Sequence, residues 1–324
     1  MHKILNSLFQ YSLFFLLIAV CVLIAVSGNY SSAVSNGINL WAACVLPSLF
    51  PYFFITSILS GLKVTGKISY RLSPFTRAFF NTGGATGYAF MTSLISGYPI
   101  GAKVVADLKN ADLITPTESV RAAAFCSTSS PMFILSSVGS IMFNSPAFGL
   151  SLFLTHVISA ILVGVIFSFY KRKDKPKNST AFINFSRADN VLYESAYSAV
   201  ISVLVVGGLI TIFYLLTEIL LSLNLLSPII DMVTLFTGDK NLSSSIVLGA
   251  FECTRGLKTL SLGKITFFTL PVAAAICGFG GLSVIAQSLA YLKKAKIKTA
   301  PFVLAKLLSA VLGFCIGLIF SLFI

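Results

Sequence analysis

Residues 83–108 have the sequence GGATGYAFMTSLISGYPIGAKVVADL, in which glycine and proline interrupt an apolar stretch. The uninterrupted apolar runs are too short for one membrane-crossing helix, which takes about 20 residues. Gly97, Pro99 and Gly101 fall close together in the run 96–101, where a helix is expected to end. We therefore predict a re-entrant hairpin of two half-helices that meet at this run. Backbone that is not helical inside the membrane needs hydrogen-bond partners from protein or water. The tip of the hairpin should therefore not face lipid.

The composition of the whole chain indicates a membrane protein. Of 324 residues, 56% are hydrophobic and 10% are charged, and the mean hydropathy is +0.92. An ordinary soluble domain has roughly 25% charged residues. The apolar runs are long and do not alternate with polar residues as the strands of a membrane β-barrel do. The sequence therefore predicts an all-α, multi-pass integral protein of the cell membrane.

The net charge is +13, from 23 Lys and Arg residues against 10 Asp and Glu residues. In a soluble protein this excess would suggest a nucleic-acid partner. In a membrane protein the same excess is explained by basic residues that gather in short cytoplasmic loops. We therefore expect a lipid bilayer as partner and no nucleic acid. The six cysteines lack the paired spacing of metal ligands, so we expect no metal site.

Two further segments carry interruptions of the same kind. A second hairpin is expected at 242–262, with a polar turn at 252–256, and Ser127 to Ser130 followed by Pro131 should break one span. The run ICGFGGLS, 276–283, should break another. With these broken spans included, we expect about seven membrane spans: 10–28, 37–62, 121–143, 147–170, 194–223, 265–292 and 301–323.

The chain repeats its order of elements. In each half a span is followed by a hairpin, an interrupted span and a plain span, and a shift of 155 residues places Gly101 on Gly256. With the N-terminus inside and the C-terminus outside, 18 of the 23 Lys and Arg residues fall in cytoplasmic segments. The halves then cross in opposite senses, which predicts an inverted-repeat transporter fold. Its parts are a first span (1–30), a first repeat (31–170), a basic cytoplasmic linker (171–192) and a second, inverted repeat (193–324).

Hairpin tips and helix breaks of such a fold meet near the bilayer midplane and form the substrate site. Each half-helix N-terminus carries about half a positive elementary charge, which attracts carboxylates. Lys103 and Arg255 are the expected cations, and Tyr98 and Phe279 are the expected flat apolar wall for an aromatic diacid. The candidate substrate-binding residues are Gly97, Tyr98, Pro99, Gly101, Lys103, Ser127, Thr128, Ser129, Ser130, Glu252, Thr254, Arg255, Gly278, Phe279, Gly280, Gly281, Ser283 and Gln287.

Several of these residues have a second interpretation. Lys103 and Arg255 can extend toward the membrane surfaces instead of the substrate. Glu252 can serve an ion, a proton or the substrate, or it can pair with Arg255. A neutral nucleoside would use Glu252 and Gln287 instead of cations. Outside the site, we expect Glu218 and Asp231 to be solvated at the interface and His156 to be a packing residue.

Five motifs carry a resemblance to a known family. They are LPSLFPYFFI (46–55), SLISGYPIGAK (93–103), AFCSTSSPMFI (124–134), GAFECTRGLK (249–258) and ICGFGGLSVIAQ (276–287). Together they resemble the sporulation integral membrane proteins called YlbJ, which carry the nucleoside-recognition or Gate domain. That domain is similar to concentrative nucleoside transporters. The resemblance implies transport of dipicolinic acid during endospore formation, across the outer forespore membrane of the mother cell.

The expected function is therefore transport of a small organic anion, with dipicolinic acid as substrate. No HExxH, GxSxG or paired-aspartate motif is present, so we expect no enzyme. A nucleoside or another small metabolite is the alternative substrate, and a non-transporting membrane assembly factor is the alternative role. We expect no cofactor. The sequence leaves open a coupled proton or sodium ion and a homo-oligomer.

Overall fold

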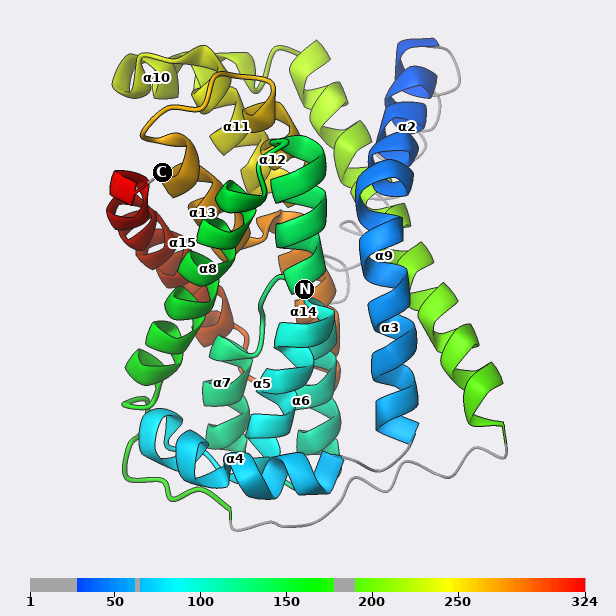
Figure 1. Ribbon diagram of the computed structural model, residues 1–324, viewed down its shortest axis with the longest axis vertical. Coiled ribbons are helices and arrows are strands. Elements are labelled where there is room, and N and C mark those ends of the chain that lie inside the picture. Colours follow the sequence, from blue (N-terminus) through cyan, green and yellow to red (C-terminus); the bar gives the residue numbers. More distant parts are fainter. Residues whose placement is uncertain (1–27, 62–64, 178–189, 324) are drawn as a thin grey trace, which may run out of the picture.

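The computed structural model describes residues 28–61, 65–177 and 190–323. Within these ranges all regular structure is helical, as the composition predicts (Figure 1). Of the first expected span, 10–28, only Gly28 belongs to the described residues. The expected linker 171–192 is described up to residue 177 and again from residue 190.

The first half of the chain consists of a long helix, a helix across its end, a hairpin, a broken helix and a plain helix. The long helix contains a π-helical turn just before Pro47, where the proline cannot donate a backbone hydrogen bond. The elements are α2 (Gly28–Leu40), η1 (Trp41–Val45), α3 (Leu46–Gly61), α4 (Thr65–Phe80), α5 (Gly84–Ser96), α6 (Ile100–Asn110), α7 (Pro116–Phe125), η2 (Phe133–Met142) and α8 (Pro146–Phe167).

The second half has the same order of elements, from the long helix to the plain helix. The elements are α9 (Val191–Ser222), α10 (Ser227–Thr237), α11 (Lys240–Phe251), α12 (Cys253–Ser261), α13 (Thr269–Phe279), α14 (Gly281–Lys294), α15 (Ala300–Phe320) and the short η3 (Ser321–Phe323). Figure 1 shows α4 lying across one end of the molecule and α10 lying across the other. The hairpin α5–α6 rises from the α4 end, and the hairpin α11–α12 descends from the α10 end.

Two elements and one turn differ from the expectation. The sequence analysis did not predict α4 or α10 as helices. The second hairpin turns at Glu252 alone, so residues 253–256 begin α12 and do not form the expected polar turn. The physical reason is capping: the Glu252 side chain accepts the backbone N–H of Arg255 and starts the helix at once.

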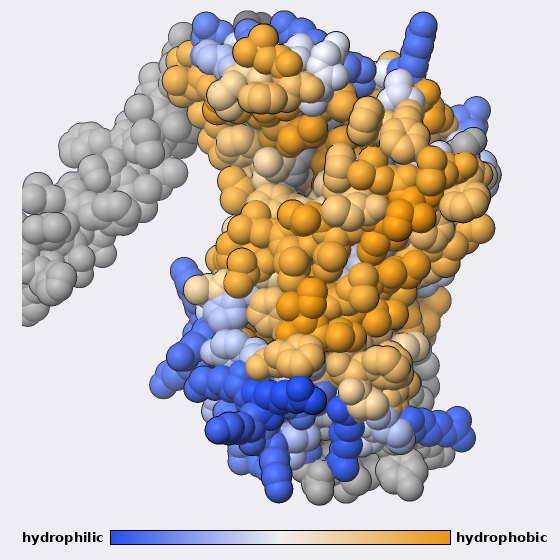
Figure 2. Space-filling model, turned by 90° about the vertical axis from the view of Figure 1, so that its left-hand side faces the viewer, coloured by the Kyte–Doolittle hydropathy of each residue, from blue (hydrophilic) through white to orange (hydrophobic). Residues whose placement is uncertain are grey.

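The face shown in Figure 2 carries an apolar belt between a strongly polar lower end and an upper end of mixed polar and apolar residues. Every fourth residue of α8 is an exposed aliphatic side chain: Leu150, Leu154, Ile158, Leu162 and Ile166. Such a stripe suits contact with lipid tails. The interior, in contrast, holds many hydroxyl groups and several charged side chains, among them Ser93, Ser96, Thr128, Ser137, Thr155, Ser159, Glu252 and Lys306.

Five helical stretches in the described residues are long and apolar enough to cross a membrane. Two of the seven expected spans are not among them: 10–28 falls almost wholly outside the described residues, and 121–143 is divided into α7 and the shorter η2. The five are Tyr30–Ile58, Pro146–Phe167, Val191–Ser222, Thr269–Lys294 and Ala300–Phe323.

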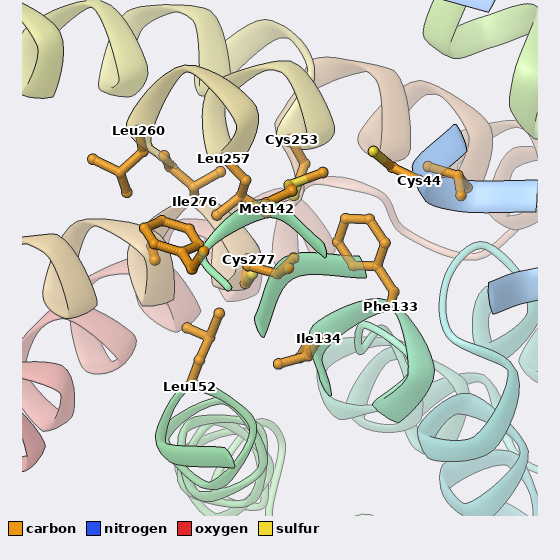
Figure 3. Packing of buried hydrophobic residues seen from close by; sticks show 14 of the residues in the cluster. Cys44, Phe133, Ile134, Met142, Leu152, Cys253, Leu257, Leu260, Ile276 and Cys277 are labelled. Carbon is orange, nitrogen blue, oxygen red and sulfur yellow. The ribbon is translucent and has the colours of Figure 1, made fainter. Parts of the chain in front are cut away.

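The core lies where the two halves meet. In Figure 3 side chains from η1, η2, α8, α12 and α13 face one another. Cys253 and Cys277 belong to this cluster and are buried. The core therefore places the second hairpin against the broken helices of both halves.

Candidate functional site

A pocket lies where the two hairpin tips and the two helix breaks come together. The pocket is narrow, with a cavity volume of about 40 Å³. The tips and breaks contribute Gly97, Tyr98, Ser129, Ser130, Glu252, Cys253, Thr254, Ser283, Val284 and Gln287. The long helices and η2 complete the wall with Val45, Leu49, Phe133, Val206 and Ile210.

The first tip is fastened to the first break by hydroxyl groups. Ser129 Oγ donates to the Tyr98 hydroxyl at 2.6 Å. Ser93 Oγ accepts the backbone N–H of Thr128 at 3.1 Å and lies 2.9 Å from the Thr128 hydroxyl. Tyr98 also reaches the second tip, because its hydroxyl donates to Cys253 Sγ at 3.6 Å. Tyr98 therefore connects three of the four elements that form the pocket.

Glycine permits the close approach at the first tip. Gly97 has φ +78°, and a Cβ there would lie 2.8 Å from the Ser130 nitrogen. A Cβ on Gly101 would lie 1.9 Å from the Cys126 carbonyl oxygen. Both contacts are with the backbone of the first break, so the hairpin packs on the break as we expected.

The second tip and the second break provide polar groups to the pocket. Glu252 is 2% exposed, and its Oε2 accepts the Arg255 N–H at 2.6 Å. Gln287 Nε2 donates to Ser283 Oγ at 3.3 Å. Gln287 Oε1 is buried and has no hydrogen-bond partner among the described residues. The pocket thus contains one carboxylate and one unused amide oxygen.

Four helices begin at this pocket: α6, the helix from Pro131 that continues as η2, α12 and α14. Glu252 caps α12, and Ser130 Oγ accepts the backbone N–H of Phe133. Among the residues that the structure describes, no side chain caps α6 or α14. Their N-terminal partial positive charges therefore remain available to an anion.

The Arg255 side chain points away from the pocket toward α9. Its guanidinium donates to the Tyr214 carbonyl at 2.9 Å, to the Thr217 hydroxyl and to the Glu218 carboxylate, and it lies 4.1 Å from the centre of the Tyr214 ring. Glu218, which was expected to be solvated at the interface, has a side chain that is 35% exposed and that also forms this ion pair. Glu252 contacts the Arg255 backbone N–H, and the guanidinium pairs with Glu218 instead.

Lys103 lies at a different cavity, between the first hairpin, α3 and α9. This cavity has a volume of about 310 Å³ and is both larger and more polar than the pocket at the tips. Its wall includes Thr56, Ser57, Tyr88, Thr92, Lys103, Asp107, Glu194, Ser195, Ser198 and Ser202. The two expected cations are thus both absent from the wall of the central pocket.

Phe279 also lies elsewhere than expected. It lines an apolar groove between α11, α13 and α15, together with residues such as Ile246 and Phe314. The aromatic residues of the pocket wall are Tyr98 and Phe133. Gly278 instead packs on α15, since a Cβ there would lie 2.6 Å from the Ser309 carbonyl oxygen.

The remaining candidates shape the tips and breaks without lining the pocket. Pro99 precedes the first residue of α6, and Thr128 bonds to Ser93. Gly280 and Gly281 both have φ +80° and allow the chain to turn between α13 and α14. The carbonyl oxygen of Ser127 accepts a hydrogen bond from Lys306.

Two residues that sequence reasoning did not assign to the site support the first break. His156 Nε2 accepts the Ser129 N–H at 2.8 Å, so His156 holds the break as well as packing beside it. Lys306 Nζ donates to the Ser127 carbonyl at 3.0 Å and is 1% exposed. The signal for Lys306 was available: it is a single lysine within the apolar helix α15.

An apolar belt, a polar interior and several membrane-length helices define this chain as an all-helical, multi-pass membrane protein. It is similar to the sporulation integral membrane protein YlbJ of Bacillus subtilis (strain 168), with 28% identity over 323 aligned residues. The alignment covers 92% of this chain and 79% of the relative. No family model matches the chain. No solved structure matches it.

Proposed function

We propose that this protein is a membrane transporter that carries a small organic anion, with dipicolinate as the first candidate. The observation that carries the proposal is the pocket formed by two hairpin tips and two helix breaks. Discontinuous helices whose ends meet at one pocket are a recurrent design of transporter substrate sites. The uncapped N-termini of α6 and α14 favour a negatively charged substrate.

The proposed mechanism is alternating access between two inverted repeats. The common order of elements in the two halves supports it, as do the opposite directions from which the two hairpins enter (Figure 1). In this mechanism one repeat moves against the other around the fixed pocket and exposes it to each side in turn. The substrate is carried unchanged, so no catalytic step is required.

Side-specific labelling tests this topology. Cysteines introduced at Lys175 and Lys298 should react with an impermeant maleimide from the same side of the membrane, and one at Lys264 should react from the other side. The expected side for Lys175 and Lys298 is the cytoplasm, because basic residues gather there. The parent protein, which has the exposed residue Cys315, measures the background labelling. Labelling of Lys175 and Lys298 positions from opposite sides would contradict the inverted repeat.

A neutral nucleoside is the second candidate substrate, and one observation favours it. Glu252 and Gln287 lie in the pocket wall, whereas Arg255 and Lys103 do not. Gln287 Oε1 has no partner among the described residues and is thus available to a hydrogen-bond donor of a nucleobase or ribose. The two candidates differ in the charge that the pocket must accept.

Uptake by purified protein in liposomes separates the candidates. For the anion, we expect saturable dipicolinate uptake that Glu252→Gln retains, because the amide oxygen still caps α12. For the nucleoside, uridine would be taken up and Glu252→Gln would abolish its uptake. Absence of uptake for every small solute tested would leave the role of a membrane assembly factor and overturn the proposal.

A role in spore formation follows from the resemblance given above and from the name of the Bacillus relative. We place the transporter in the outer forespore membrane, as that resemblance implies. Localisation of a fluorescent fusion around the engulfed forespore is the expected result. A fusion that stays in the mother-cell plasma membrane would contradict this location.

A further inference from the structure

Lys306 lies behind the wall of the central pocket, at the point where three of its elements meet. Its Nζ donates to the Ser127 carbonyl of the first break at 3.0 Å. The same atom lies 5.3 Å from the centre of the Tyr98 ring in the first tip. A Cβ on Gly280, in the second break, would lie 3.7 Å from the Lys306 Cε. Tyr98 lines the pocket, whereas Lys306 does not.

The charge of Lys306 has no acidic partner nearby. Within the described residues, no carboxylate oxygen lies within 4.0 Å of its Nζ. The side chain is 1% exposed, so water does not screen it either. A lysine buried at membrane depth without an acid is costly and therefore marks a functional site. A single carbonyl and an aromatic face compensate only part of this cost.

The other ionisable groups close to Lys306 do not neutralise it. His156 accepts the Ser129 N–H through Nε2, so that nitrogen carries no proton and the ring is neutral. Cys253 and Cys277 are buried and Tyr98 is partly buried, and all three side chains are neutral in their protonated forms. The carboxylate of Glu252 is directed to the N-terminus of α12, where it compensates that helix end. One positive charge thus remains beside the pocket.

We propose that Lys306 is the residue that makes the pocket select anions. This inference rests on the function proposed above and replaces Arg255 and Lys103 as the source of positive charge. The ammonium acts on a bound carboxylate through the low-dielectric wall, together with the uncapped N-termini of α6 and α14. Lys306 is therefore a specificity-determining residue that works without lining the pocket.

A purely structural role makes a different prediction. If Lys306 served only to satisfy the Ser127 carbonyl, its removal would disturb the first break and weaken every ligand equally. A charge that selects anions should instead affect a charged ligand and spare a neutral ligand of the same shape. Pyridine-2,6-dicarboxylate and its neutral diamide form such a pair.

The experiment measures binding of both ligands to purified, full-length protein in detergent, by calorimetry. For Lys306→Met we expect dicarboxylate affinity to fall at least about tenfold while diamide affinity stays within about twofold. Lys306→Arg should keep the preference for the dicarboxylate. Lys306→Gln retains a donor for the Ser127 carbonyl but no charge, so it should behave as the methionine variant does. Lys109→Gln, which removes a positive charge at the far end of α6, is the matched control and should bind like the parent.

Each outcome is decisive. Unchanged dicarboxylate affinity in folded Lys306→Gln, or equal losses for both ligands, would overturn the role of Lys306 and leave the transporter proposal standing. If the parent protein binds neither ligand, the proposed substrate class fails and this inference fails with it. Elution as a single symmetrical peak in size-exclusion chromatography verifies that each variant is folded.

Discussion

Replacing Gly101 by alanine should abolish uptake and lower the unfolding temperature of the purified protein. The new Cβ would lie 1.9 Å from the Cys126 carbonyl oxygen and 2.6 Å from Ser93 Oγ. The first of these atoms is backbone in the break itself, so it cannot rotate away as the end of a side chain can. Overpacking at well-packed sites typically costs about 1–3 kcal/mol, and here it would also displace the tip from the break. The expected loss of stability is about 2 kcal/mol or more.

Gly208 offers a matched control for this variant. It lies in the helix α9, and a Cβ there would meet no atom within 4 Å. Gly208→Ala should leave uptake unchanged and raise stability by at most about 1 kcal/mol, since alanine favours a helix over glycine. Membrane insertion of both variants is checked by their yield after membrane extraction. If Gly101→Ala retained uptake and stability, the first tip would not need its close contact with the break.

The hairpins and breaks could be predicted because their signals are local. Glycine and proline between 96 and 101 end one helix and begin another, and the structure has α5 and α6 on either side of that run. Pro131 begins the second part of a broken helix, as its position after four hydroxyl residues indicates. These features depend on backbone preferences of the residues themselves, so sequence alone determines them.

The directions of long side chains could not be predicted in the same way. Arg255 points to Glu218, which lies 37 residues earlier on another helix. Nothing near Arg255 in the sequence distinguishes this direction from one toward the pocket. The same holds for Phe279, which lies in a helix break but faces the apolar groove between α11, α13 and α15. Such directions are set by packing between helices, which a single sequence does not specify.

The short helices at the two ends escaped prediction for a different reason. α10 has 11 residues and α4 contains Pro74, so neither has the length or the regular pattern of a membrane span. Both lie across an end of the molecule (Figure 1), where an amphipathic helix suits a membrane interface. The length criterion for membrane spans does not detect such helices.

A polar cluster at the α4 end fixes the base of the first hairpin. The carboxylate of Glu118, which is 1% exposed, accepts the backbone N–H groups of Gly83, Thr115 and Lys177. It thereby connects the start of α5, the start of α7 and the segment after α8. Nearby, the ammonium of Lys177 donates to the Asp112 carboxylate at 3.0 Å and holds the pKa of that carboxyl below its usual value.

Arg121 completes this cluster from α7 and is fully buried. Its guanidinium donates to the carbonyl oxygens of Asn81 at 2.6 Å, Tyr170 at 2.9 Å, Lys171 at 2.7 Å and Asp174 at 3.3 Å. These carbonyls belong to the turn after α4 and to the segment after α8. One side chain therefore connects three separate parts of the chain, and the planar arrangement of its donors makes this possible.

Replacing Arg121 by methionine should destabilise the protein by about 3 kcal/mol or more, because several carbonyl oxygens lose their partner in one step. Thermal unfolding in detergent measures this loss. The unfolding temperature of Arg121→Lys should fall between those of the parent and of Arg121→Met. A lysine has fewer donors than an arginine, and its single ammonium group cannot contact several separated carbonyl oxygens at once. The matched control is Arg172→Met, because Arg172 is exposed and its guanidinium lies 5.0 Å from the centre of the Phe169 ring. That control should cost less than about 1 kcal/mol. Equal unfolding temperatures for Arg121→Met and Arg172→Met would show that the hairpin base does not depend on the buried guanidinium.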